Sequence, residues 1–325
     1  MSEKKWGFNR TVTFEDKNTL PILSFNQTIS IVGLLKISDF FEGFQGMKPY
    51  EFGKGKPPQT REMMVEKVYH SSTKIDDSYY LLLGSTNVQR YFIREQKSFI
   101  KYGNHLAAAR KIEIFSKPRI LVNRILSRDK IDASYVENTL INNTDIFNFI
   151  CRNDDREIIT TILTIINSKL CAFYFKTNNV NLDRKVFPKL NVNNILEFPI
   201  PENINDYKLS LSANADSMLS LNKDLQEVSA KFQRTCERKF ENLNQNKKLQ
   251  DWYKLSYADF IKELTKQKIK LTLSEEAEWA DYSDQEKSKA LEIQAKIAST
   301  DKEIDQMVYE LYGLSEEEIG IVENN

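Results

Sequence analysis

Short apolar runs alternate with polar punctuation through the first 200 residues of the chain. Runs such as TISIVGLL, YYLLLG and PRILVNRIL are bounded by Gly, Pro and Asn, a pattern typical of short strands joined by turns. One segment differs, because apolar residues recur at helical spacing between Asp154 and Lys176. These residues are Ile158, Ile159, Ile162, Leu163, Ile166 and Leu170. We therefore predict a mixed α/β domain over residues 1–203 that contains one clear helix.

Prolines mark the end of this domain, and heptad repeats characterise the region beyond it. Pro199 and Pro201 in FPIPEN cannot continue a helix and favour an extended exit. Beyond them, two series of apolar residues repeat at intervals of seven. The first series is Leu211, Met218, Leu225 and Phe232, and the second is Ala290, Ile297, Ile304 and Leu311. Residues 204–325 are predicted to form an all-α region with a long antiparallel helical hairpin, which makes the fold class α+β.

The heptad seams allow two interpretations. They can pack against each other inside one helical hairpin, or they can join two copies of the chain as a coiled coil. Internal packing is the more economical interpretation. A homodimer through the C-terminal helices stays open as the alternative.

Composition limits the remaining possibilities. The chain has 325 residues, of which 41% are apolar, so two domains can each bury a core. No run of about 18 apolar residues occurs, and MSEKKWGFNR lacks the apolar core of a signal peptide. We expect a soluble, cytoplasmic protein that does not enter a membrane. Three cysteines without CxxC spacing and only two histidines leave little material for a metal site or a Ser-His-Asp triad.

The formal net charge of zero hides a strong imbalance along the chain. Residues 1–200 carry 29 Lys and Arg against 21 Asp and Glu, whereas residues 201–325 carry 17 against 25. Residues 84–130 hold eleven basic groups and three acids, which accounts for the excess in the first part. Cations gathered without anions repel one another, and a polyanionic partner removes that cost.

A glycine-rich stretch, FEGFQGMKPYEFGKGKPPQT at residues 41–60, invites a test for nucleotide or methyl-donor binding. Gly43 and Gly46 are too widely spaced for a GxG turn, and Gly53-Lys54-Gly55 runs into two prolines that prevent a helix start. The Walker spacing is absent as well, because the lysine before the prolines is not followed by Ser or Thr. We conclude that this stretch is a surface loop and not a catalytic loop.

A metal-dependent nuclease site is a further alternative. Asp77, Glu95 and Lys97 have the loose order of two carboxylates that bind magnesium and a lysine that assists the attacking water. Acidic residues followed closely by lysine recur elsewhere in this highly charged chain, so the pattern has low specificity. Glu95 also lies in the basic segment, where pairing with a neighbouring cation is the simpler role.

The basic segment contains the residue types that nucleic-acid recognition uses. Cations hold phosphates, while Asn, Gln and Arg read base edges and aromatic rings support or stack on bases. Residues 84–130 interleave these types, with Tyr91, Phe92 and Tyr102 among the arginines and lysines. We therefore predict a nucleic-acid-binding surface there.

The order of motifs in this chain resembles the C-terminal target recognition domain of TaqI-type DNA adenine methyltransferases and of type IIG restriction-modification enzymes. The motifs are FFEGFQGMKPY, GKGKPPQT, LLLGSTNVQRYFI, IKYGNHLAAAR, KPRILVNRI, ITTILTIINSKLCAFYF, VFPKLNVNNILEFPIP and DKEIDQMVYELYGLSEEEIGIVE. Together they run from about residue 31 to residue 323. The resemblance implies a specificity module that reads double-stranded DNA for a restriction-modification system.

The same resemblance implies that the chemistry belongs elsewhere. Enzymes of this kind carry a catalytic domain with an NPPY-type tetrapeptide that holds the flipped adenine, and this chain has no NPP[YF] sequence. S-adenosylmethionine is thus expected on a catalytic domain or subunit outside this chain, which itself needs no cofactor or metal. The partners expected are double-stranded DNA and a DNA adenine methyltransferase. An alternative is an assembly or decoy protein that binds a methyltransferase without binding DNA.

The expected DNA contacts come from the loop at residues 48–61, the basic segment and a later loop. The predicted residues are Lys54, Lys56, Gln59, Arg61, Asn87, Gln89, Arg90, Arg94, Lys101, Tyr102, Asn104, Arg110, Lys117, Arg119, Arg124, Arg128, Arg184 and Lys185. Arg119 and Arg124 lie at odd separation in an expected strand and should face opposite sides. One of these two arginines is therefore expected to be structural.

Overall fold

The computed structural model describes residues 35–94, 98–126, 130–178, 189–241 and 243–324, together with the backbone of four short strands nearer the N-terminus. Those strands are β1 (Lys4–Trp6), β2 (Arg10–Val12), β3 (Thr19–Leu23) and β4 (Thr28–Val32), and they form two antiparallel pairs. The chain divides into two compact units. The first comprises residues 1–215 and 304–325, and the second comprises residues 216–303.

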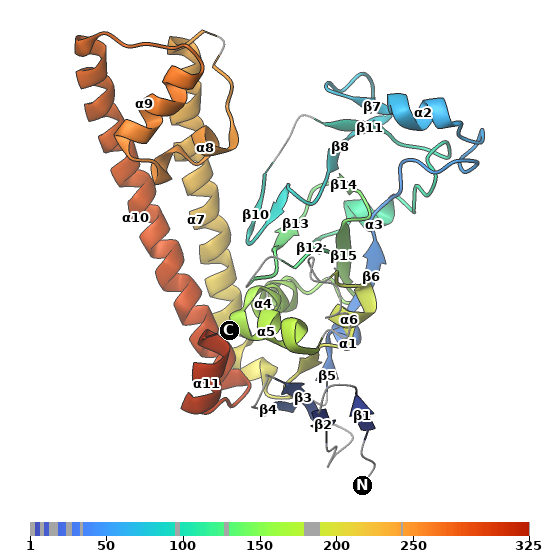
Figure 1. Ribbon diagram of the computed structural model, residues 1–325. Helices are drawn as coiled ribbons and strands as arrows, with labels where there is room; N and C mark the ends of the chain where they lie inside the picture. The colour runs from blue at the N-terminus through green and yellow to red at the C-terminus, as the bar shows by residue number, and fades with distance from the viewer. Residues whose placement is uncertain are drawn as a thin grey trace. The chain divides into compact units, whose positions relative to one another are not determined.

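A four-stranded antiparallel sheet lies at the centre of the first unit (Figure 1). Its strand order is β13 (Ala133–Val136), β12 (Arg119–Asn123), β15 (Ile146–Cys151) and β6 (Phe41–Gln45). Every residue of β12 and β15 is buried. Strands covered on both faces need packing partners on each side, and helix α4 (Arg156–Asn167) packs against β12 and β13.

A second four-stranded sheet carries the segments from which the functional surface is built. Its order is β14 (Ile141–Asn142), β8 (Tyr79–Leu83), β11 (Phe99–Lys101) and β7 (His70–Ser71). Strand β8 pairs in parallel with β14 and antiparallel with β11. Because β14 is followed four residues later by β15, the chain passes directly from this sheet into the central one.

Shorter elements complete the first unit. Two further antiparallel pairs join β9 (Val88–Gln89) to β10 (Phe92–Ile93) and β5 (Leu35–Lys36) to β16 (Pro199–Ile200). The short helices are α1 (Ile37–Phe40), α2 (Arg61–Glu66), α3 (Glu113–Ser116), α6 (Val192–Leu196) and α11 (Glu316–Glu323). The pairing of β16 confirms the extended exit predicted from the two prolines in FPIPEN.

The helix predicted over residues 154–176 is in fact two helices, α4 and α5 (Lys169–Asn178), which are bent by 57° at Ser168. Ser168 has an extended backbone, and its hydroxyl donates to the carbonyl of Ile165 and accepts from the Cys171 amide. The Lys169 amide donates to Asp305 Oδ1. Ser168 thus ends one helix and caps the next, which an apolar periodicity by itself does not reveal.

The first unit extends past the domain boundary predicted at residue 203. The start of α7 (Ile204–Lys239) packs on α4, because Thr160 Oγ1 lies 2.8 Å from Ser212 Oγ and Lys208 Nζ lies 2.7 Å from Asp155 Oδ2. The end of α10 (Leu273–Leu311) returns to the same unit. Two long helices therefore run through the division, and the sequence boundary and the packing boundary do not coincide.

The second unit is built around aromatic side chains. Besides the remaining parts of α7 and α10 it contains α8 (Lys247–Gln250), a 3-10 turn (Trp252–Lys254) and α9 (Tyr257–Lys266). The rings of Phe232 and Trp252 stack at 3.6 Å, and those of Phe240 and Trp279 lie 4.9 Å apart. These side chains are buried in one cluster with Leu225.

The heptad series mark buried positions on the two long helices. Leu211, Met218, Leu225 and Phe232 are buried on α7, and Ala290, Ile304 and Leu311 on α10. Phe240 of α7 meets Trp279 near the start of α10, while Asn214 meets Met307 near its end. The two helices are therefore antiparallel, and the prediction of an α+β fold with a long C-terminal helical region is confirmed. A homodimer through these helices stays a prediction.

The cysteines and the membrane test add two findings. Cys151, Cys171 and Cys236 are all free thiols and buried, as expected for small apolar side chains. In the described part of the chain, no single helix has the length and apolar character needed to cross a membrane. Only α4 and α5 taken together reach that composition, and both belong to the core of the first unit.

One buried arginine ties the central sheet together. Arg119 of β12 is 0% exposed, and its Nε donates to Asn148 Oδ1 of β15 at 3.0 Å. Its remaining nitrogens donate to the carbonyls of Lys117, Asn138 and Leu140. Burial lowers the pKa of the Arg119 guanidinium to about 10, so it is still charged at neutral pH. The prediction that Arg119 contacts DNA is wrong, because the fold leaves none of its surface accessible.

Replacing this arginine should destabilise the first unit. In Arg119→Met the aliphatic volume is largely kept, but three carbonyls and the Asn148 amide oxygen lose their donor. Buried acceptors left unpaired cost about 1–3 kcal/mol each, partly relieved by relaxation, so we expect a loss of about 3 kcal/mol in the free energy of unfolding by urea. Lys117→Ala, at an exposed neighbour, should change it by less than about 0.5 kcal/mol. Equal stability of the two variants would contradict this account.

Candidate nucleic-acid interface

Two loops of the first unit, residues 48–60 and 101–110, are joined by backbone hydrogen bonds. The amides of Lys48 and Ala108 each donate to the carbonyl of the other residue at 2.9 Å. The Lys56 amide donates to the carbonyl of Asn104. We call this pair of loops, with Arg61 and Lys117 at its margins, the basic edge. It combines the glycine-rich loop with part of the basic segment, although some 50 residues separate them in sequence.

Gln59 fixes the shape of the first loop from inside. Its Nε2 donates to the carbonyls of Pro49 and His105 at 2.9 and 2.7 Å, and its Oε1 accepts from the Glu51 amide. The side chain is 2% exposed. The prediction that Gln59 reads bases is therefore wrong, because all of its hydrogen-bonding groups serve the loop.

Gly55 lets the two loops approach. Its φ is +85°, and a Cβ at this position would lie 2.3 Å from the carbonyl oxygen of His105. Any side chain would therefore push the loops apart. The glycines of this stretch serve loop geometry, in agreement with the prediction of a surface loop.

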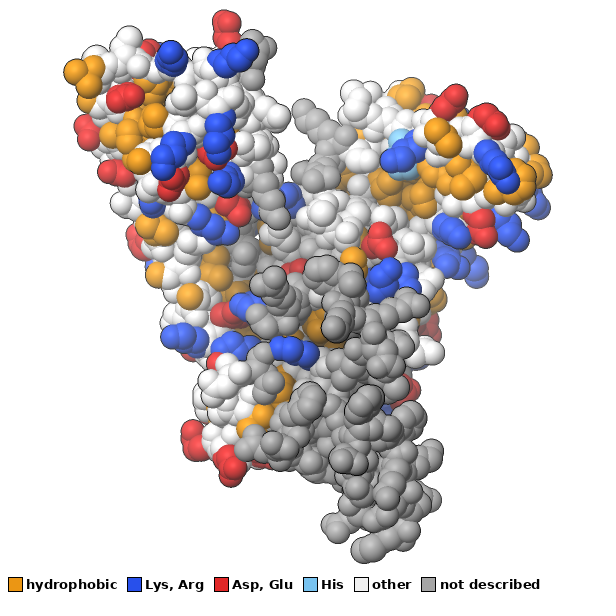
Figure 2. All heavy atoms as spheres, in the orientation of Figure 1, with side chains coloured by type: hydrophobic (Ala, Val, Ile, Leu, Met, Phe, Trp, Pro, Cys, Tyr) orange, Lys and Arg blue, Asp and Glu red, His pale blue; other side chains and the backbone are white. Residues whose placement is uncertain are grey.

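Six cations of the basic edge are exposed and unpaired. Among the residues that the structure describes, none of them makes an ion pair. They are Lys54, Lys56, Arg61, Lys101, Arg110 and Lys117. Figure 2 shows Lys and Arg side chains spread around the part of the first unit that Figure 1 labels α2, next to an apolar patch. All six were predicted to contact DNA.

Lysines of the second unit have a different environment. Those with an acidic partner within 4 Å are Lys231, Lys239, Lys248, Lys254, Lys262, Lys266, Lys289 and Lys296. Such surface pairs contribute little to stability, but they neutralise the field of each cation. Among the described residues, the basic edge thus gathers exposed cations without ion pairs, whereas these lysines of the second unit are paired.

Aromatic rings and both histidines support the basic edge from beneath. Tyr50 stacks on Tyr69 and on His70, and the ring of Tyr69 lies 4.3 Å from that of His105. The Tyr50 hydroxyl accepts from the Tyr69 amide and also hydrogen-bonds to His70 Nδ1 at 3.0 Å. Burial, with a smaller contribution from Lys67, lowers the pKa of His70. Burial and Lys67 both favour the neutral form of the His70 ring.

His105 is a loop hydrogen-bonding residue. Its Nε2 lies 2.9 Å from the carbonyl oxygen of Lys101. A carbonyl can only accept, so this nitrogen carries the hydrogen. Its own backbone carbonyl accepts from Gln59.

The predicted residues between 87 and 94 serve the fold to different degrees. Asn87 is 2% exposed, and its side chain accepts from the Gly84 amide and donates to the carbonyl of Arg94. The prediction that Asn87 contacts DNA is wrong for this reason. Arg90 is half-buried and donates to the carbonyl of Asn167, while Gln89 and Arg94 are half-buried.

The remaining predicted residues fall into three groups. Asn104 is exposed, whereas Tyr102 is half-buried and its hydroxyl donates to the carbonyls of Ala109 and Arg110. Burial raises the pKa of Tyr102 to about 12. Arg119 and Arg124 were expected to face opposite sides of a strand. Arg124 is half-buried just beyond β12, so it is the accessible one of the two. Arg128, Arg184 and Lys185 lie outside the described residues.

The alternative nuclease site finds no support in the described residues. Asp77 is exposed and pairs with Lys74 at 3.0 Å. Glu95 and Lys97 lie outside the part of the chain that the structure describes. Within that part, no three His, Cys, Asp or Glu side chains are grouped so that they could hold a metal ion.

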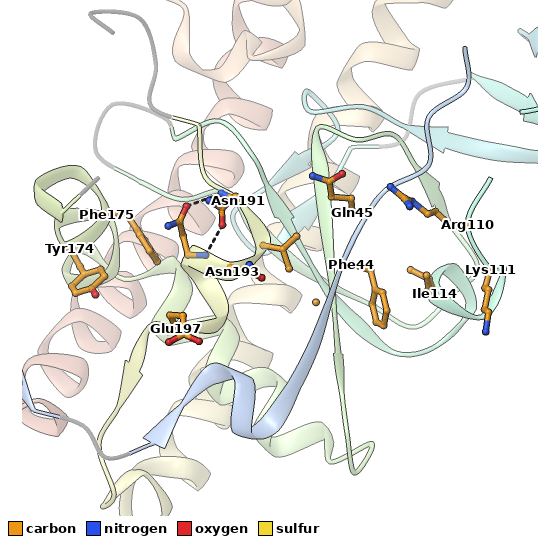
Figure 3. A pocket seen from close by; sticks show the side chains of 13 residues that line it. Phe44, Gln45, Arg110, Lys111, Ile114, Tyr174, Phe175, Asn191, Asn193 and Glu197 are labelled. Atoms are coloured by element: carbon orange, nitrogen blue, oxygen red, sulfur yellow. Dashed lines mark hydrogen bonds between the residues drawn. The ribbon is translucent and has the colours of Figure 1, made fainter. Parts of the chain in front are cut away.

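A pocket of about 1000 Å³ lies beside the basic edge and was not predicted from the sequence. Figure 3 shows Phe44 and Gln45 of β6, Arg110 and Lys111, Phe175 of α5 and Asn193 of α6 among its lining. Asn191 and Asn194 cap one another across the start of α6, so their side chains are already engaged. The lining comes from segments far apart in sequence, which is why no motif signals it.

Comparison with known families agrees with this geometry. Residues 80–200 match the family model of the TaqI-like C-terminal specificity domain. The chain therefore contains a TaqI-like specificity domain, as the motifs suggested. This match begins at β8 and includes the 101–117 part of the basic edge, while the 48–61 loop precedes it. Residues 204–308 match a second family model, a domain of unknown function (DUF8810).

Two other comparisons give less. No curated protein matches the chain. A solved structure of the type IIL restriction-modification enzyme MmeI in complex with DNA is similar at a TM-score of 0.40 and 9% sequence identity, over 90% of this chain and 42% of that chain. The chain thus spans less than half the length of that enzyme.

Gln59→Leu should loosen the basic edge without removing a charge. The variant leaves the Glu51 amide and two carbonyls without partners. We expect amide hydrogen exchange at Glu51 and Gly53 to become at least about tenfold faster, since losing a buried hydrogen-bonded group costs about 1–3 kcal/mol. Gln45→Leu, a half-buried residue of β6, is the matched control and should leave these amides unchanged. Exchange rates that are equal in the two variants would show that Gln59 does not fix the loop.

Proposed function

We propose that this chain is the DNA specificity module of a restriction-modification system. The observation that carries the proposal is the basic edge, whose six exposed cations lack acidic partners among the described residues and border or lie within a TaqI-like specificity domain. Cations held close together without ion-pair partners raise the free energy of the isolated protein. Binding a polyanion lowers it again and releases counterions.

The basic edge contains groups for both parts of DNA recognition. The lysines suit phosphates, because an ammonium group is a compact charge that does not discriminate bases. Arg61, Arg110 and Asn104 carry planar groups that can form two hydrogen bonds to a base edge. Gln89, Arg90, Arg94, Tyr102 and Arg124 are half-buried and stay candidates for contacts at the margin. Arg128, Arg184 and Lys185, outside the described residues, stay predicted DNA contacts.

Catalysis is proposed to reside outside this chain. In this proposal an adenine methyltransferase domain or subunit of the type IIG kind supplies S-adenosylmethionine and the pocket for the flipped base. The second unit, whose lysines are largely paired with acids, would avoid DNA and dock the catalytic partner or a second copy of the chain. The proposed compartment is the cytoplasm, where such a system acts on DNA.

Removing cations from the basic edge should weaken DNA binding in a salt-dependent way. For Lys54→Ala, Lys56→Ala and Arg61→Ala combined, we expect the slope of log K against log salt concentration to fall in magnitude by about 0.9 for each phosphate that is no longer neutralised. Binding of labelled duplexes from a random pool, titrated between low and physiological salt, measures the slope.

The matched control removes three paired lysines from the second unit. Lys254, Lys262 and Lys296 each have an exposed or half-buried acidic neighbour. Their combined replacement by Ala should leave the slope unchanged. An equal effect of both triple variants, or a wild-type affinity that does not respond to salt, would contradict the proposal.

If catalysis resides outside this chain, methylation should depend on a separate catalytic partner. The purified chain alone should transfer no methyl group from S-adenosylmethionine to adenine in duplex DNA and should cut no DNA with magnesium. A methyltransferase encoded next to this chain should co-purify with it and should methylate one specific sequence only when the chain is present. Methylation or cleavage by the chain alone would overturn this division, and co-purification without any DNA affinity would favour the decoy alternative.

A further inference from the structure

Phe52 lies at the tip of the first loop with 63% of its surface exposed. Neighbouring large apolar side chains that are exposed to water indicate a surface that a partner covers. Further exposed apolar residues lie on and after α2, namely Val65, Val68 and Ile75. Figure 2 shows the apolar patch in this region of the first unit, next to Lys and Arg side chains.

The backbone on both sides of Phe52 is fixed by Gln59. The Glu51 amide donates to the Gln59 side chain, and the Gly53 amide donates to the Gln59 carbonyl at 3.0 Å. Gly53 has a φ of +73°, and nothing lies within 4 Å of the position of a Cβ there. The turn therefore points outward from the protein, and Phe52 is presented by a rigid loop.

Arg61 covers one side of the exposed ring. Its guanidinium carbon lies 5.5 Å from the centre of the Phe52 ring, within the range of a cation–π contact. The contact restrains the guanidinium, whose hydrogen-bonding edge makes no ion pair among the described residues. Lys54 and Lys56 are exposed in the same turn.

We propose that Phe52 and Arg61 enter a groove of duplex DNA as one stacked unit, with the ring in apolar contact with base pairs and the guanidinium on a base edge. The inference rests on the proposed function. It adds Phe52 as a specificity-determining residue and couples it to Arg61, in a loop that precedes the matched specificity domain. Unpaired cations beside the ring favour DNA over a protein, because lysine is depleted in protein–protein interface cores. Apolar side chains are used in both grooves, on thymine methyl groups and between base steps.

The test compares full-length variants for affinity and for base preference. Duplexes selected from a random pool by the wild-type chain define its site, and each variant is then titrated on that site and used for its own selection. Phe52→Ala should bind the wild-type site about tenfold more weakly, with an unchanged salt slope because no charge is lost. Its own selection should lose the preference at one or two adjacent base pairs.

Two further variants separate the pair from general surface effects. Val65→Ala removes another exposed apolar side chain and should change neither affinity nor preference. Arg61→Ala should relax the same base pairs as Phe52→Ala, and the double variant should lose less affinity than the sum of the single losses. Unchanged thermal unfolding of all variants verifies that the fold is kept, as expected for exposed positions.

Different results would contradict the proposed function and the inference about Phe52 and Arg61. A wild-type chain that shows no salt-dependent DNA binding overturns the proposed function and this inference together. A wild-type chain that binds DNA while Phe52→Ala selects the same site with equal affinity overturns the inference alone. Loss of methyltransferase binding in Phe52→Ala with unchanged DNA affinity would also overturn it, because the ring would then cover a protein surface.

Discussion

A charged group buried in a sheet organises the first unit. The Arg119 guanidinium is removed from water entirely, and a cation in such a place is tolerated only if its donors are satisfied. Asn148 on the neighbouring strand and three backbone carbonyls provide the acceptors. One of those carbonyls belongs to Leu140, which immediately precedes β14 of the second sheet. The arginine thereby ties the central sheet to the segment that leads into strand β14 of the second sheet.

The second sheet lies next to the two loops of the basic edge and supports them. His70 of β7 belongs to the group of stacked rings in the basic edge. Gln59 holds the first loop through two hydrogen bonds and joins it to the second through a third, to the carbonyl of His105. A recognition surface gains when its groups are already in place, because less side-chain and loop entropy is lost on binding. Buried polar residues such as Gln59 and Asn87 thus support the exposed groups of this face without contacting a ligand themselves.

The two units differ more clearly in how many of their cations form ion pairs than in their net charge. The chain is neutral overall, but eight lysines of the second unit lie beside acids, whereas six cations of the basic edge make no ion pair among the described residues. A pair of opposite charges has little field at a distance of a Debye length, while unpaired cations attract a polyanion from farther away. The same residue type therefore has opposite consequences in the two parts of the chain.

Patterns in the sequence determined the α+β class, the long helices, their buried seams and the specificity-domain resemblance, because periodicity and the order of motifs can be read along the chain without knowing which distant segments touch. The exposed cations of the basic edge were also found this way. Burial was not, since Gln59, Asn87 and Arg119 have the composition of DNA-contacting residues and only tertiary packing removes them from the surface. The break at Ser168, the pocket beside β6 and the pairing of the two loops likewise depend on contacts between distant segments, which no local pattern records.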